Sequence, residues 1–137
     1  MFAHEYHHKA WGHHWFVLQG GQGVEGTLLE MMIIEGQADL FAENLFPDLK
    51  PQWNQPFAEE VEAALWNRLQ PALASTDQQE HGLYLFGNES EGLPWCVGYS
   101  FGRVIVADYL SKHPDLSFSG LIKVAPKAIF AGSRFNK

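Results

Sequence analysis

The sequence predicts one mainly α-helical domain with little or no β-sheet. Apolar residues recur at helical spacing in three long segments, residues 27–46, 57–70 and 94–113. The chain has 137 residues, enough for one hydrophobic core, and no internal repeat or second domain is evident. Its apolar fraction of 46% and aromatic fraction of 14% are typical of folded globular proteins. We therefore expect residues 1–137 to form a single domain.

Residues 2–11 are the first predicted helix, and residues 4–8 within it have the pattern H-E-x-x-H. On a helix, His4 and His8 lie on one face about 6 Å apart along the axis. Two imidazoles so placed can bind one metal ion. Glu5 lies about 100° further round, where it can reach a metal-bound water without binding the metal itself. This arrangement indicates a zinc hydrolase, the alternative being a solvated His-rich helix.

The residues after this helix offer a different third ligand. In the metzincin pattern H-E-x-x-H-x-x-G-x-x-H, the last histidine falls at His14. The glycine of that pattern falls at Trp11, however, and Gly12 comes one position late. An exposed or stacking His14 is therefore favoured, and its role as a ligand stays an alternative. Gly12 is also expected to weaken the helix.

A glycine-rich stretch follows at residues 20–26. Gly21, Gly23 and Gly26 match G-x-G-x-x-G, and residues 15–18 before them could be a strand. A dinucleotide-binding fold needs a further strand after the next helix, but a proline-rich loop follows that helix here. We favour a hinge or mobile rim over a nucleotide site.

The second strong helix is predicted at residues 27–46. Thr27 precedes it as a cap, and Glu30 stands three residues later, as in a capping box. Glu35 lies within a run of methionine, isoleucine and leucine residues, where an ionised carboxylate costs several kcal/mol unless it is paired or bound to metal. A zinc ion held by the two histidines would satisfy Glu35 and complete a shell of two histidines and one glutamate. The alternative is an ordinary surface glutamate.

Two neighbours of Glu35 support this site. Asp39 lies one turn further on the same face, where it can accept the free ring N–H of a zinc-binding histidine. Gly36 removes a side chain at a position where two helices must approach closely.

The rest of the chain continues the helical pattern. A loop with three prolines at residues 47–56 separates the second helix from an amphipathic helix at 57–70. Asp77 is a predicted cap for a short helix, and a polar loop follows at 87–92. The long helix at 94–113 has Pro94 in its first turn, and two short helices split at Pro126 come last. The residues of 57–70 expected to face inward are Phe57, Val61, Ala64, Leu65 and Leu69.

The motifs at residues 4–8, H-E-Y-H-H, and 35–39, E-G-Q-A-D, resemble those of the gluzincin metallopeptidases, whose second motif is E-x-x-x-D. They are still more similar to the YjaZ-like family of predicted bacterial zinc-dependent proteases. In that family H-E-[YF]-x-H and E-G-x-A-[DE] recur, followed by a glycine–tyrosine helix and a short helical C-terminus. The resemblance covers most of the chain from residue 3 onward. It implies a zincin-like active-site subdomain in which the H-E-x-x-H helix packs against the Glu-bearing helix.

The resemblance also implies an activity, which is zinc-dependent hydrolysis of peptide bonds in a peptide or protein substrate. One zinc ion would be held by His4, His8 and Glu35, with Glu5 as the general base. In related enzymes a tyrosine or histidine from beyond the metal ligands helps to stabilise the oxyanion, and Tyr99 is the candidate here. A buried Tyr99 with a satisfied hydroxyl is the alternative.

Members of this family usually have more sequence before the H-E-x-x-H motif, and in gluzincins a strand from that region pairs with the substrate. We therefore expect this chain to lack the upstream β-containing part of the family. The competing hypothesis is a truncated or degenerate relative that binds metal as a non-catalytic interaction module.

Charge and composition exclude several other functions. The formal net charge of −7, without a basic patch, argues against nucleic acid as a partner. Cys96 is the single cysteine, so no internal disulfide is possible and a cytoplasmic location is expected. Residues 1–15 carry histidines where a signal peptide has an apolar run, and no apolar stretch approaches 18 residues, so no membrane span is expected.

Overall fold

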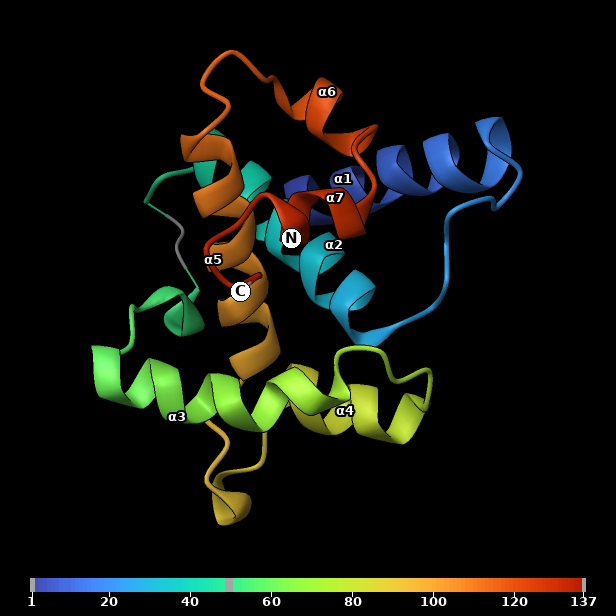
Figure 1. Ribbon diagram of the computed structural model, residues 1–137. Helices are drawn as coiled ribbons and strands as arrows, with labels where there is room; N and C mark the ends of the chain where they lie inside the picture. Colours follow the sequence, from blue (N-terminus) through green and yellow to red (C-terminus); the bar gives the residue numbers. More distant parts are fainter. Residues whose placement is uncertain (1, 49–50, 137) are drawn as a thin grey trace.

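Helices α2 (Leu28–Leu45) and α5 (Val97–Ser111) cross at the centre of the molecule, and the other helices surround this pair (Figure 1). The computed structural model describes residues 2–48 and 51–136. Within these ranges it contains seven α-helices and no β-strand, which confirms the predicted mainly α-helical fold class. The remaining α-helices are α1 (Phe2–Gly12), α3 (Glu59–Leu69), α4 (Gln78–Phe86), α6 (Phe118–Ile122) and α7 (Pro126–Ala131).

Glycines bring the two central helices together. A Cβ atom added to Gly36 of α2 would overlap the backbone of Gly102 in α5, and one added to Gly102 would overlap the carbonyl oxygen of Met32. The predicted close approach at Gly36 is therefore confirmed, and α5 supplies a matching glycine. The fully buried side chains around this crossing include Leu28, Met32, Ile33, Phe101, Ile105 and Val106.

The start of α2 is closed by its own side chains. The Thr27 hydroxyl accepts a hydrogen bond from the Glu30 N–H at 3.2 Å, as a capping box requires. The Glu30 carboxylate accepts from the N–H groups of Glu25 and Gly26, at 2.8 and 2.9 Å. Backbone N–H groups of this kind bind the phosphates of a dinucleotide in a glycine-rich loop. Here these two already donate to Glu30, which argues against the dinucleotide-binding alternative.

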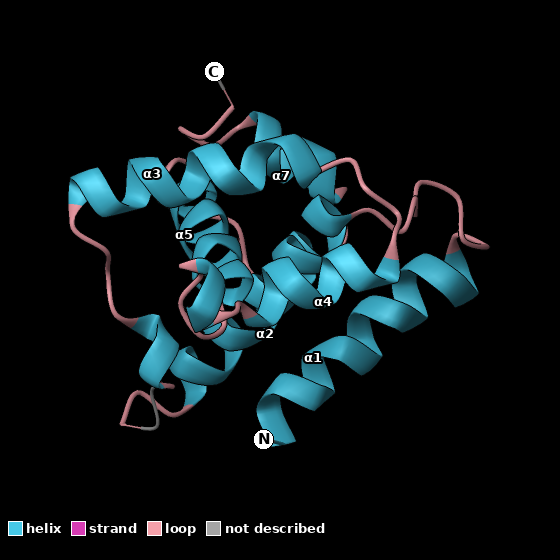
Figure 2. Ribbon diagram, turned by 90° about the horizontal axis from the view of Figure 1, so that it is seen from below, coloured by secondary structure: helices cyan, strands magenta, loops and turns pink. Residues whose placement is uncertain are grey.

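Helix α1 lies along one edge of the molecule (Figure 2) and ends at Gly12, one residue beyond the predicted range 2–11. The chain continues as a π-helix at His13–Leu18, so the strand considered for residues 15–18 is not formed. The Trp15 indole N–H donates to the carbonyl oxygen of Ile122 at 2.8 Å. This bond attaches the π-helix to the C-terminal part of the chain.

Two predicted helix details are wrong. Helix α5 begins at Val97 rather than at Pro94, because Cys96 adopts a left-handed conformation with φ of 57° and breaks the helix there. In α3, Leu65 and Leu69 are buried, but Val61 is 47% exposed and Ala64 is exposed too. The N-terminal part of α3 projects to one side of the central pair of helices (Figure 1).

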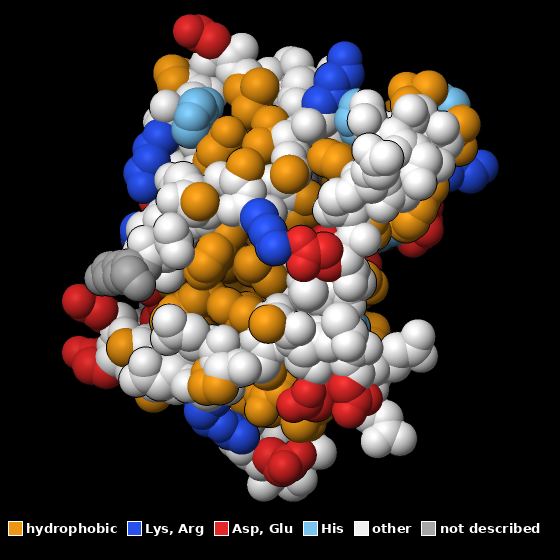
Figure 3. Space-filling model, turned by 45° about the vertical axis from the view of Figure 1, so that its right-hand side comes forward, with side chains coloured by type: hydrophobic (Ala, Val, Ile, Leu, Met, Phe, Trp, Pro, Cys, Tyr) orange, Lys and Arg blue, Asp and Glu red, His pale blue; other side chains and the backbone are white. Residues whose placement is uncertain are grey.

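The surface is mixed, with hydrophobic side chains gathered in the middle of the face shown in Figure 3 and many charged groups towards its edges. Across the described part of the chain, no helix is long and apolar enough to cross a membrane.

The close contact of α2 and α5 at Gly36 and Gly102 predicts how an added methyl group there would change stability. Gly102→Ala would force α2 and α5 apart, and we expect it to lower the free energy of unfolding by about 3 kcal/mol or more. Gly82→Ala in α4 is the matched control, because nothing lies within 4 Å of its added Cβ. It should raise the free energy of unfolding by about 0.5–1 kcal/mol. Urea denaturation measures both, and equal effects would contradict the role given to the crossing.

Candidate metal centre

Helices α1 and α2 bring His4, His8 and Glu35 together. The Nε2 atom of His4 lies 2.9 Å from Nε2 of His8 and 2.9 Å from Oε2 of Glu35. The third side of this triangle, from His8 Nε2 to Glu35 Oε2, is 3.2 Å. Their side chains keep 16, 25 and 14% of their surface exposed, so the group is shielded but reachable. It is a group of side chains that could hold a metal ion.

Asp39 sets the orientation of the His4 ring. Its Oδ1 atom lies 2.9 Å from His4 Nδ1, and Trp53 donates its indole N–H to Oδ2 at 2.8 Å. A carboxylate can only accept, so the proton of this bond resides on Nδ1 of His4. The lone pair of the neutral ring is then on Nε2, directed at His8 and Glu35.

The close approach of His4 Nε2, His8 Nε2 and Glu35 Oε2 would be stabilised by a cation. In the neutral tautomer, His4 Nε2 presents a lone pair to a carboxylate oxygen and to a second ring nitrogen at hydrogen-bonding distance. Extra protons or a metal ion can relieve this repulsion. Ligands of a tetrahedral zinc ion with bonds of about 2.0–2.1 Å lie about 3.3–3.4 Å apart. The triangle therefore needs to widen by only a few tenths of an ångström, so the residues fit zinc.

The same contacts shift the acidities of the metal-free site. Burial by itself lowers the pKa of His4, but hydrogen bonds to Asp39 and Glu35 outweigh it and raise that pKa from 6.5 to about 9. Burial by itself raises the pKa of Glu35, but hydrogen bonds to His4 and His8 outweigh it and lower that pKa well below 4.5. At neutral pH, metal-free His4 is thus an imidazolium paired with two carboxylates. Its contribution to stability is complete below pH 6.5 and is lost as the pH rises through about 9.

His7, the remaining histidine of the motif, has a different environment. It is 1% exposed, and its Nε2–H donates to the side-chain oxygen of Gln37 at 3.1 Å. Burial is the main cause that lowers the pKa of His7 to about 4, so its ring is neutral. We therefore assign His7 to the packing of α1 on α2.

Of the other residues considered for the site, Tyr99 lines a cavity together with His4, whereas Glu5 and His14 do not. Tyr99 and His4 line the same cavity, which has a volume of about 850 Å³. Burial, followed by the charge of Glu35, raises the pKa of Tyr99 above its usual range, so its hydroxyl keeps its proton. Glu5 is exposed and is absent from the described lining of this cavity. His14 stacks edge-on against Trp15, with ring centroids 5.0 Å apart, and is not in the ligand group.

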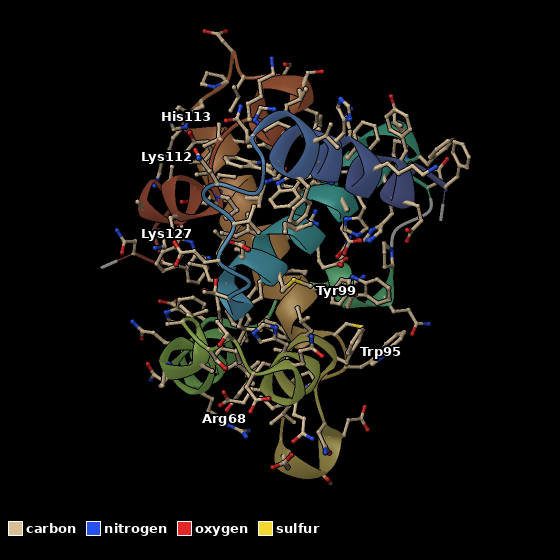
Figure 4. All side chains as sticks on the ribbon, turned by 90° about the vertical axis from the view of Figure 1, so that its right-hand side faces the viewer. Arg68, Trp95, Tyr99, Lys112, His113 and Lys127 are labelled. Atoms are coloured by element: carbon tan, nitrogen blue, oxygen red, sulfur yellow. The ribbon has the colours of Figure 1, made fainter. Side chains whose placement is uncertain are left out.

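Two contributors to the site escaped the sequence analysis. Trp53 donates to Asp39 from the proline-rich loop, and the wall of the cavity includes Trp95, just before α5. Figure 4 shows Tyr99 and Trp95 on the same side of the molecule. A tryptophan between prolines was the only signal for Trp53, because loops carry no periodicity.

Fold and site together define a helical protein with a candidate site for one metal ion. The chain belongs to the family described as predicted Zn-dependent protease (DUF2268), which matches residues 1–131. The resemblance stated from the two motifs is thereby confirmed, and the family name implies a dependence on zinc. Searches of curated proteins and of solved structures found no match to the chain.

The ligand group predicts which substitutions weaken zinc binding. Changing a side chain that merely orients a ligand costs about 10–100-fold in metal affinity, so Glu35→Ala should cost at least about 100-fold. His14→Ala should leave the affinity unchanged, because His14 lies outside the group. Competition with a chromogenic zinc chelator measures both variants. The reverse pattern would support the His14-liganded alternative.

The raised pKa of His4 predicts that zinc displaces a proton. Between about pH 7 and about pH 9, zinc affinity should rise close to tenfold per pH unit, and it should level off above the pKa of His4. Calorimetry in two buffers of different ionisation enthalpy measures the released proton. In Asp39→Asn, which loses the carboxylate charge, the rise should move to lower pH. A pH-independent affinity in the unmutated chain would refute this description of His4.

Proposed function

We propose that this protein is a zinc-dependent peptidase. The observation that carries the proposal is the triangle of two imidazole nitrogens and one carboxylate oxygen, with sides of 2.9, 2.9 and 3.2 Å, between α1 and α2. A catalytic zinc site uses three protein ligands and leaves a fourth position open. The family description supports the same class of reaction.

In this proposal, His4, His8 and Glu35 bind the ion, and Asp39 holds the His4 ring in its ligating tautomer. Zinc bound there would acidify water and polarise the peptide carbonyl. Glu5, next to the first ligand on α1, takes the proton of the attacking water and later passes it to the leaving amine. Its exposure allows it to exchange protons with solvent.

Tyr99 is proposed to donate a hydrogen bond to the oxyanion that develops on the substrate. Its hydroxyl is a donor at any working pH, because burial and the Glu35 charge raise its pKa. Tyr99 belongs to α5 and lines the same cavity as His4 of α1, so it can contact a substrate bound there beside the metal ligands.

A second function rests on the position of Glu5. Glu5 is exposed and is not part of the described cavity wall. The proposed general base and the cavity that would hold the substrate are therefore separate in this structure. A protein that binds metal in this way without turning over a substrate would be an interaction module rather than an enzyme.

Glu5→Gln separates the two functions. For a peptidase, we expect the variant to keep its zinc and to lose about 10²–10⁴-fold in kcat, because the general base is removed. Glu60→Gln, an exposed glutamate in α3, is the matched control and should keep full activity. The assay uses a library of quenched fluorescent peptides, with zinc content measured in parallel. Absence of cleavage by the zinc-loaded unmutated chain would favour the interaction module.

A further inference from the structure

The cavity beside His4 has walls of unusual composition. Its aromatic lining consists of Trp53, Phe86, Trp95 and Tyr99, and its volume of about 850 Å³ is in the range of small-ligand sites. These rings pack against one another: Trp53 lies 5.1 Å from Trp95 and 5.7 Å from Tyr99 between ring centroids, and Phe86 lies 5.7 Å from Tyr99. The cavity is thus an aromatic pocket that borders the metal ligands.

Two hydrogen bonds fix Trp53 in the wall of the pocket. The Trp53 side chain donates to Asp39, and its backbone carbonyl accepts from the Ser100 hydroxyl at 2.6 Å. Trp95 and Phe86 are nevertheless 54 and 52% exposed, so much of their ring surface faces water. Covering such surface with another apolar group is favourable by about 25 cal/mol per Å².

The charge of the pocket discriminates between side chains. Its described lining includes the carboxylates of Asp39 and Asp48. Glu43 also lines it, but the Arg103 guanidinium pairs with this carboxylate at 2.8 and 2.9 Å. Burial raises the pKa of the Cys96 thiol to about 11, so this part of the wall is neutral. An acidic side chain entering here would be desolvated beside other carboxylates, which is unfavourable.

We infer that this pocket selects the substrate by holding a large apolar side chain, preferably an aromatic one, of the residue next to the cleaved bond. The inference rests on the proposed peptidase function, because the pocket and the metal ligands share His4. Aromatic side chains stack favourably on the tryptophan rings, and acidic ones are rejected. Trp95 is the specificity-determining residue, since it borders the pocket without bonding to the ligand group.

The first experiment measures binding without catalysis. The zinc-loaded protein is titrated with N-acetyl-phenylalanine amide while the indole N–H signals of its five tryptophans are followed by NMR. The signals of Trp53 and Trp95 should shift and those of Trp11 and Trp15, outside the pocket, should not. N-acetyl-aspartate amide should shift none of them. Equal shifts with both probes would overturn the inference.

The second experiment measures selectivity in cleavage. Peptides that differ only in one residue beside the cleaved bond should show kcat/KM at least about tenfold higher for Phe than for Ala, and lowest for Asp. Trp95→Ala should remove most of the preference for Phe over Ala, and Trp95→Leu should keep part of it. Phe16→Ala, which removes a 58% exposed aromatic ring outside the pocket, is the matched control.

The two readouts separate the failures. Cleavage without a Phe preference, together with no shift of Trp53 or Trp95, would overturn the pocket and leave the peptidase intact. Selective shifts without cleavage of any peptide would refute the peptidase and, with it, the substrate role of the pocket. In that case the aromatic-binding cavity itself would still be established.

Discussion

The hydrogen bonds of Asp39 hold the candidate site together. One carboxylate oxygen fixes the His4 ring, and the other fixes the indole of Trp53. The first bond directs a lone pair at Glu35, and the second places an aromatic wall beside the same ligand. Asp39 is 3% exposed, so neither bond competes with bulk water. Metal binding and substrate selection, as proposed, therefore depend on one carboxylate.

Much of this arrangement follows from local sequence. The four-residue spacing of His4 and His8 predicts a shared face, and the same spacing from Glu35 to Asp39 predicts a ligand and its neighbour on α2. An acidic residue in an apolar run needed a partner, and the structure places two histidines beside it. Gly36 predicted a close helix contact, which occurs at α5.

The features that could not be predicted depend on distant parts of the chain. Periodicity does not reveal that α1 runs on into a π-helix, because the anchor of that segment, the bond from Trp15 to Ile122, spans more than one hundred positions. The left-handed Cys96 shortens α5 at a residue type that rarely adopts this conformation. The aromatic pocket combines residues from α1, α2, a proline-rich loop, α4 and α5, and its aromatic residues Trp53, Phe86 and Trp95 belong to no motif.

Helix α1 docks with little hydrophobic surface, and this has a consequence for how the molecule opens. Its buried residues are one alanine, one histidine and one tryptophan, and much of its hold on α2 comes from the polar pairs of His4 with Asp39 and His7 with Gln37. A metal ion bound by His4 and His8 of α1 and Glu35 of α2 would thus hold the two helices together in addition to its proposed role in catalysis. Stripping it away would leave this first helix as one of the easiest parts of the molecule to detach by local unfolding.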